Sequence, residues 1–185
     1  MIREEIIERR VGNRSMRCLL PACIEFGGKT TMAVMRDLSN HGAGFEAHIE
    51  LQIGQPLQYS WGTEEPRSGR VIWCHDGRFG IENDIVVEPS NPPTHNYRSV
   101  RAPMSAPAEI ITEGGRAYGE VVNLAQRGLC MLTSKSIAKG TVATIKLGRR
   151  RLEFVTAKWS DGDRIGISFP KPIAVFEMAK IMQGA

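Results

Sequence analysis

An internal repeat constrains the fold of this chain more than any other feature of its sequence. Pro21 recurs as Pro107, 86 positions later, and the same offset holds without a gap from residue 21 to residue 81. Self-similarity at a fixed spacing is the signature of a duplicated structural unit. The matched pairs are Pro21-Ala22-x-Ile24 with Pro107-Ala108-x-Ile110, Asp37-Leu38-x-x-x-Gly42 with Asn123-Leu124-x-x-x-Gly128, Gly54 with Gly140, Trp73 with Trp159, and Gly80-Ile81 with Gly166-Ile167. We therefore expect two copies of one domain, in residues 1–88 and 98–185.

A proline-rich stretch, residues 89–97, separates the two copies. It begins after Glu88 and places Pro89, Pro92 and Pro93 among polar residues. Proline has no backbone N–H and cannot donate to a sheet ladder. The stretch therefore predicts a fairly stiff linker that limits how freely the copies reorient.

Within each copy, short apolar runs bounded by glycine predict strands and very little helix. A copy of fewer than 90 residues suits a small barrel, and closure of the sheet leaves no exposed edge. The predicted fold is all-β, with two tandem six-stranded antiparallel barrels and a short C-terminal helix over residues 172–182 that lies on the second barrel as a lid. The clearest strands are predicted at residues 18–26, 30–38, 44–49, 56–61, 69–74, 78–82, 116–122 and 141–147, with Gly27-Gly28 as the first hairpin turn.

Composition places the chain among soluble globular proteins, with 42% hydrophobic and 24% charged residues. No apolar run approaches the roughly 18 residues that a membrane-spanning helix needs. The first residues lack the apolar core of a signal peptide. We therefore expect a cytoplasmic protein without membrane insertion.

The sequence predicts no catalytic or metal centre. The cysteines form no CxxC pair and have no histidine pattern beside them that would complete a zinc site, so we expect buried or half-buried thiols and no cofactor. No nucleophile stands at a useful spacing from a base, which argues against an enzyme. The four cysteines are Cys18, Cys23, Cys74 and Cys130.

Two short segments of the first copy carry residue types that suit a nucleotide. Arg9, Arg10 and Arg14 precede the first predicted strand. Arginine presents a planar fork of donors that matches phosphate oxygens and the O6/N7 edge of guanine. Taken alone, such a segment is also typical of a solvated charge run.

The second segment, residues 37–42, joins the second and third predicted strands. The Asp37 carboxylate can accept hydrogen bonds from guanine N–H groups, and Ser39 can donate or accept beside it. Gly42 permits a close backbone approach or a positive φ. Alone, this pattern is also typical of a turn whose Asp and Ser bond their own backbone.

Together the two segments resemble the cyclic di-GMP motif of the PilZ domain family. The matching residues are Arg10-x-x-x-Arg14 and Asp37-x-Ser39-x-x-Gly42, with Val71-Ile72-Trp73 and Phe79-Gly80-Ile81-Glu82 as a further typical stretch. The resemblance implies a six-stranded barrel whose arginine loop folds over the bound dinucleotide. It implies ligand-binding roles for Arg9, Arg10, Arg14, Asp37, Ser39, Asn40, His41 and Gly42, although His41 also fits a solvent-facing loop histidine.

The second copy resembles the fold but departs from the site. At the common offset, Arg10 falls on Asn96, Arg14 on Val100, Asp37 on Asn123 and Ser39 on Ala125. We expect this barrel to bind cyclic di-GMP weakly or not at all and to serve interdomain or partner contacts. Trp73 and Trp159 occur in both copies, including the one without the motif, which favours a core position for both.

Three hypotheses for function remain. The first is a cyclic di-GMP receptor whose bound ligand changes contacts between the barrels or with a protein effector, the second barrel being the expected partner surface. The second is a ligand-independent adaptor built from two degenerate barrels. A third and weaker one is nucleic-acid binding by the basic second half, since residues 87–185 carry 14 Lys and Arg against 8 Asp and Glu. A monomer and a homodimer are both compatible with the sequence.

Overall fold

The computed structural model describes residues 15–86 and 99–184. The proline-rich linker predicted at 89–97 lies outside the described residues. Within the described part, no helix is long and apolar enough to cross a bilayer.

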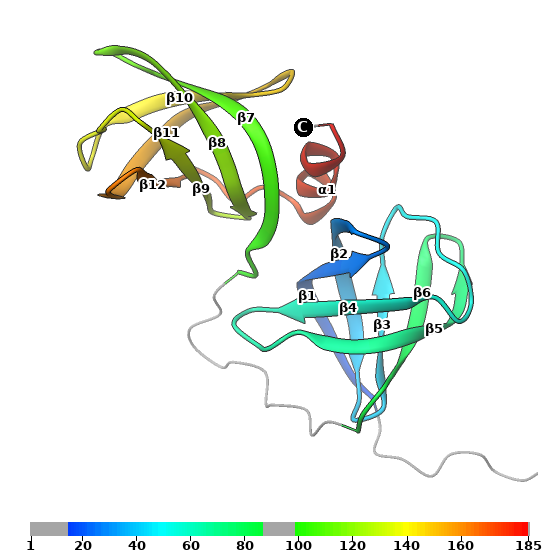
Figure 1. The fold of residues 1–185 in the computed structure, drawn as a ribbon. Helices are drawn as coiled ribbons and strands as arrows, with labels where there is room; N and C mark the ends of the chain where they lie inside the picture. Colours follow the sequence, from blue (N-terminus) through cyan, green and yellow to red (C-terminus); the bar gives the residue numbers. More distant parts are fainter. Residues whose placement is uncertain (1–14, 87–98, 185) are drawn as a thin grey trace, which may run out of the picture.

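The first barrel is a closed ring of six antiparallel strands (Figure 1). Its hydrogen-bonded order is β1-β2-β3-β6-β5-β4, and β4 pairs back with β1. Gly27 and Gly28 both have positive φ, as a type I′ hairpin turn between β1 and β2 requires. The strands are β1 (Met16–Phe26), β2 (Lys29–Leu38), β3 (Gly42–Glu46), β4 (Pro56–Trp61), β5 (Arg67–His75) and β6 (Arg78–Asn83).

The second barrel repeats this topology strand for strand. Its order is β7-β8-β9-β12-β11-β10, and β10 pairs back with β7. The strands are β7 (Ala102–Thr112), β8 (Gly115–Ala125), β9 (Gly128–Thr133), β10 (Val142–Leu147), β11 (Arg150–Asp161) and β12 (Arg164–Ser168). Two closed six-stranded antiparallel barrels followed by a C-terminal helix confirm the fold class predicted from the repeat.

The C-terminal helix, α1 (Val175–Gln183), begins later than predicted. Ile173 is held against the β8–β9 turn, where its N–H donates to the carbonyl of Gln126 at 2.8 Å and its carbonyl accepts from the Gln126 side chain at 3.3 Å. These two bonds keep the residues after Pro172 out of the helix. Gly184 ends the helix, as predicted.

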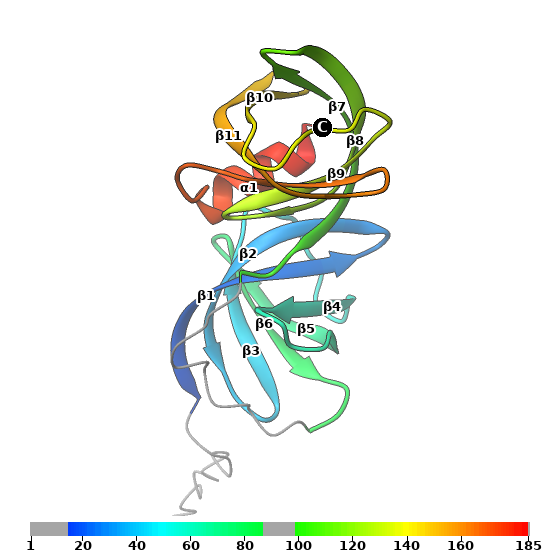
Figure 2. The ribbon, with the colours of Figure 1, turned by 90° about the vertical axis from the view of Figure 1, so that its left-hand side faces the viewer.

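Helix α1 packs against both barrels, which corrects its predicted position on the second alone. It contacts β2 of the first barrel and lies between the two barrels in both views (Figures 1 and 2). Met178 belongs to the apolar core of the second barrel, and that core also includes Cys23 and Met32 of the first. The ring of His48 lies 5.0 Å from the ring of Phe176. The barrels are thus joined by a shared apolar layer.

Candidate ligand-binding site

A β-bulge in β2 directs Asp37 to the outside of the first barrel. Met35 pairs with Phe45, whereas Asp37 pairs with Gly44, so two steps along β2 match one step along β3. Side chains alternate along a regular strand, which would put Asp37 on the inward face with the buried Met35. A bulge re-aims the residues that follow it. The Asp37 carboxylate consequently lies over Gly44, where any Cβ would collide with it.

A second bulge, in β5, does the same for Trp73. Val71 is buried and pairs with Ile81, but Trp73 pairs with Gly80. The indole is 44% exposed and covers the position where a Cβ of Gly80 would stand. The core position predicted for Trp73 is therefore wrong. The prediction failed because the bulge shifts the alternation by one residue.

The β2–β3 loop is held by its own backbone and by Ser39. The Ser39 N–H donates to the carbonyl of Gly42 at 2.8 Å, and the Gly42 N–H donates to the Ser39 hydroxyl at 3.2 Å. Of the two roles expected for Gly42, the close approach applies, because a Cβ there would overlap the carbonyl oxygen of Ile81. The serine therefore shapes the loop as a local turn does.

These elements meet around an open pocket of about 210 Å³ on the outer face of β2, β3, β5 and β6. Four of the predicted site residues line it together: Asp37, Ser39, His41 and Gly42. Asn40 lies outside the lining, and its carbonyl accepts a hydrogen bond from the Asn83 side chain at 3.3 Å. Arg9, Arg10 and Arg14 lie outside the described residues.

The charge of the pocket defines what it can bind. Its charged lining residues within the described chain are two acids, Asp37 and Glu82. Asp37 has no hydrogen-bond or ion-pair partner among residues 15–86 and 99–184, so its oxygens remain open to a ligand donor. Carboxylates accept the N–H groups of a base and repel phosphate. This pocket is suited to the base of a nucleotide, and the phosphates require cations from elsewhere.

The sequence analysis missed two residues beside the pocket. Trp73 lines it and offers an exposed aromatic face. Arg17 on β1 stands directly opposite Asp37 in the strand register and is exposed. The pairing of a tryptophan with a glycine on the next strand, repeated in both copies, was the available signal for Trp73. Nothing in the sequence marked Arg17, because its position depends on register.

A polar network fixes the end of the barrel next to the loop. The Tyr59 hydroxyl donates to Asn83 Oδ1 at 3.0 Å, and the Asn83 N–H donates to the carbonyl of His41 at 2.7 Å. The Arg67 guanidinium stacks 4.6 Å from the centre of the Trp61 ring, and its buried Nη1 has no hydrogen-bond partner among the described residues. The bonds of Asn83 pin the loop that carries His41 to the barrel wall.

The cysteines have no metal-binding arrangement in the described part of the chain. Burial, followed by the charge of Asp37, raises the pKa of Cys18 to about 11. Cys23 and Cys130 are buried, as predicted, but Cys74 is exposed. Cys74 stands near the end of β5, where the barrel rim leaves it open to solvent, so the buried position predicted for it is wrong.

A comparison of the sequence with models of known protein families gives a match over the first barrel. The sequence model of the family described as the PilZ domain matches residues 8–89. The first barrel is a PilZ domain. The pocket built by the bulges in β2 and β5 of this domain is called the PilZ pocket below. No curated protein sequence matches the chain.

Solved structures similar to this chain match most of its length at low identity. One is the inhibitor of motility MotI/DgrA of Bacillus subtilis, with 11% identity, 91% of this chain and 95% of that chain covered, and a TM-score of 0.36. Another is PlzA of Borreliella burgdorferi in complex with c-di-GMP, with 10% identity, 93% of each chain covered and a TM-score of 0.38. A third is MrkH of K. pneumonia in its apo state, with 10% identity, 89% and 82% covered and a TM-score of 0.34. The family assignment rests on the sequence match.

Proposed function

We propose that this protein is a receptor for cyclic di-GMP, which it binds on the outer face of its PilZ barrel. The observation that carries the proposal is the open Asp37 carboxylate, turned outward by a bulge into a pocket shared with Trp73. Membership of residues 8–89 in the PilZ family supports the same ligand. No enzymatic step is part of the proposal.

The two halves of the ligand are assigned to two parts of the chain. Asp37 accepts hydrogen bonds from the N1–H and N2–H groups of guanine, and the face of Trp73 packs against the base. Arg9, Arg10 and Arg14 bind the phosphates and the guanine O6/N7 edge, as the family resemblance implies. Arg17, opposite Asp37 on β1, adds a cation at the same edge. Removal of the carboxylate leaves buried guanine donors without an acceptor, which weakens binding strongly.

Isothermal titration calorimetry with cyclic di-GMP tests this assignment. Wild-type protein is expected to bind with a heat that gives affinity and stoichiometry. Asp37→Ala and the double variant Arg10→Ala/Arg14→Ala are each expected to lose about tenfold or more in affinity, the scale of one lost charge-assisted hydrogen bond.

Glu153→Ala is the matched control for the loss of a carboxylate. Glu153 is an exposed residue on β11 of the second barrel, so its removal should leave the titration unchanged. Binding that survives both site variants at wild-type strength would remove the proposed site. No binding by the folded wild-type chain would favour the ligand-independent adaptor instead.

We further propose that the ligand acts on the contact between the barrels or on a protein effector. Strand β2 carries Asp37 near one end and Met32, which belongs to the shared apolar core, five residues away. At roughly 3.3 Å per residue the two positions are about 17 Å apart along one strand. Helix α1 packs on this same strand. A ligand that displaces β2 would therefore act directly on the apolar layer between the barrels, without an intervening loop. In this proposal residues 1–88 form the receptor domain and 98–185 the domain that responds, joined by residues 89–97 and acting in the cytoplasm.

A further inference from the structure

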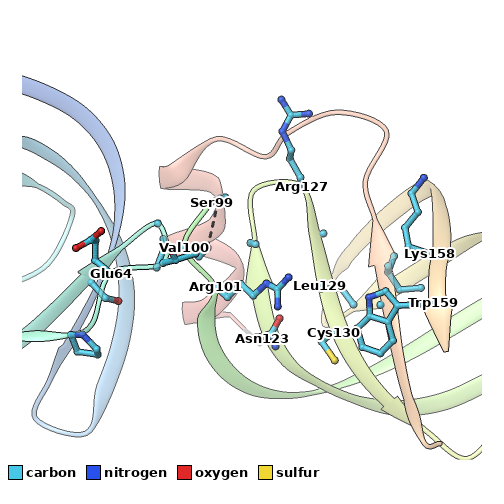
Figure 3. Close-up of a pocket in the computed structure, with 18 residues that line it drawn as sticks. Glu64, Ser99, Val100, Arg101, Asn123, Arg127, Leu129, Cys130, Lys158 and Trp159 are labelled. Carbon is cyan, nitrogen blue, oxygen red and sulfur yellow. Dashed lines mark hydrogen bonds between the residues drawn. The ribbon is translucent and has the colours of Figure 1, made fainter. Parts of the chain in front are cut away.

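The second barrel has its own pocket at the place that corresponds to the PilZ pocket (Figure 3). Its volume is about 640 Å³, within the range of about 300–1,000 Å³ usual for small-molecule sites. Strands β8, β9, β11 and β12 line it, and the β4–β5 turn of the first barrel, including Gly62 and Glu64, forms the opposite wall. The residues found 86 positions after those of the first pocket are Asn123, Ala125, Arg127, Gly128, Leu129, Cys130, Lys158, Trp159, Gly166 and Ile167.

Both bulges that build the first pocket recur here, although Cys130 stands opposite Asn123 where Gly44 stands opposite Asp37. One bulge separates Val121 from Asn123 on β8, and another separates Ala157 from Trp159 on β11. The Trp159 indole covers Gly166 and is 44% exposed, so its predicted core position is wrong for the same reason as that of Trp73. The second pocket therefore keeps an outward amide and an outward aromatic ring although it has lost the motif.

The charge of the lining is reversed between the two pockets. His41 is replaced by Arg127, and Ile72 by Lys158, while Arg101 lines the second pocket from the start of the barrel. Figure 3 shows Arg101 beside Asn123, and Arg127 and Lys158 extending from the same side of the barrel. Glu64 is the acidic residue among the described lining and stands on the wall formed by the first barrel.

The three cations are not neutralised within the second barrel. Other cations of the second barrel, such as Arg116, Lys146 and Arg150, each form an ion pair with a glutamate. Arg101, Arg127 and Lys158 form none with any residue in 15–86 or 99–184. Unpaired cations that line a concave surface attract anions, and arginine forks match phosphate oxygens.

Asn123 changes what the pocket can recognise in a base. A carboxylate at this place, as at Asp37, offers acceptors alone, which suits the N–H groups of guanine. An amide offers one acceptor and two N–H donors, the combination that pairs with the N6–H and N7 of adenine. Asn123 is half-buried, and its side chain has no hydrogen-bond partner among the described residues. Its amide is free to select a ligand.

We propose that this pocket is a second ligand site, which binds an adenine nucleotide. Arg127 and Lys158, together with Arg101, bind the phosphate; Trp159 packs against the adenine ring; and Asn123 pairs with its edge. The site shares no lining residue with the PilZ pocket, so adenine-nucleotide binding can be tested separately from cyclic di-GMP binding.

The indole N–H signals of the full-length protein report on the two sites separately. The chain has three tryptophans, of which Trp61 is buried, Trp73 lines the first pocket and Trp159 lines the second. Trp73→Phe and Trp159→Phe assign the signals in a ¹H–¹⁵N spectrum. AMP is expected to move the Trp159 signal in a saturable way, and cyclic di-GMP the Trp73 signal. A titration in which AMP fails to move Trp159 overturns the second site and leaves the first untouched.

Charge and base selectivity are tested by matched variants. Arg127→Ala/Lys158→Ala is expected to weaken AMP binding about tenfold or more, because charge-assisted contacts are lost. Lys139→Ala/Arg149→Ala removes the same charges from exposed turns and should leave AMP binding unchanged. All four side chains are exposed, so these substitutions are compatible with folding. Equal weakening by both double variants would mean general electrostatic attraction and would overturn a built site.

Two further probes test the remaining parts of the proposal. GMP is expected to bind more weakly than AMP, and Asn123→Asp is expected to shift the preference toward GMP. Inorganic phosphate that moves the Trp159 signal at the same concentration as AMP would overturn the role of the aromatic ring. GMP that binds as well as AMP would overturn base selection by Asn123.

Discussion

The two barrels share strand order and bulges but differ in the side chains of their interiors and of their outer pockets. Ring order and the bulges in the second and fifth strands are the same in both. The first interior is aromatic, with the Phe45 ring 5.2 Å from the rings of both Tyr59 and Phe79. The corresponding residues of the second barrel, Met131, Ile145 and Ile165, are buried and aliphatic.

The difference shows which features define this fold and which define its chemistry. A closed six-stranded ring tolerates an aromatic or an aliphatic interior as long as the volume is filled. It does not tolerate side chains at the close strand approaches, where a Cβ on Gly42 or Gly128 would overlap a carbonyl oxygen of the neighbouring strand. Ligand chemistry varies on the outer face, where Asp37 is matched by Asn123.

The largest expected effect concerns the aromatic interior. Phe45→Ala removes the ring that contacts Tyr59 and Phe79 and should lower the free energy of unfolding by about 3–5 kcal/mol. Urea unfolding followed by far-UV circular dichroism measures the change. Leu19→Ala, at a position 69% exposed in the same barrel, is the control and should stay within about 0.5 kcal/mol of wild type. A loss below about 1 kcal/mol for Phe45→Ala would contradict a packed aromatic core.

A smaller effect is expected at alkaline pH. Burial raises the pKa of Tyr59 above its usual value, against the opposing effect of the Arg67 charge, so the folded state favours the neutral phenol. This stabilisation is complete below the unfolded pKa of about 10 and is lost as pH rises through the folded value. The raised pKa of Cys18, about 11, adds a loss of the same sign.

Tyr59→Phe should therefore weaken the fall in stability above pH 10 without abolishing it. Thermal unfolding measured between pH 8 and pH 11 provides the comparison. The second barrel has Ile145 at this position, which does not ionise. A Tyr59→Phe variant that loses stability with pH as steeply as wild type would show that Tyr59 does not contribute to the fall.

The smallest expected effect concerns the contact between α1 and the first barrel. Phe176→Ala removes the ring contact with His48 and should weaken the attachment of α1 to the first barrel by about 0.5–1.5 kcal/mol. Amide relaxation measured by NMR should then show more independent motion of the two barrels. In wild type, cyclic di-GMP should move signals of α1 as well as those of the pocket. Signals of α1 that never respond to bound ligand would contradict transmission along β2.

The sequence was sufficient to predict the barrels because the repeat and the glycine-bounded runs report on local geometry. Pro56–Trp61 was predicted with both of its ends correct, and Gly27-Gly28 as the first turn. The motif also led to Asp37, Ser39, His41 and Gly42, which line one pocket. These features depend on turns and spacing, which a single chain displays directly.

What the sequence did not predict depends on register and on contacts between distant segments. A bulge adds one residue without a marked residue type, so the outward faces of Trp73 and Trp159 could not be inferred from alternation. Cys23 and Met32 look like residues of their own barrel core, yet they pack with the second barrel and α1. The burial of Arg67 at the barrel end likewise depends on its packing against Trp61, which no sequence motif indicates.

The outward bulges separate recognition from folding. Asp37 and Trp73, like Asn123 and Trp159, project from a wall whose other side is already closed and filled. Their replacement alters what the surface selects without opening a cavity beneath it. In a duplicated barrel of this kind, a few surface substitutions can change the ligand specificity of one copy while the fold is kept. The same property would allow a new specificity to be engineered.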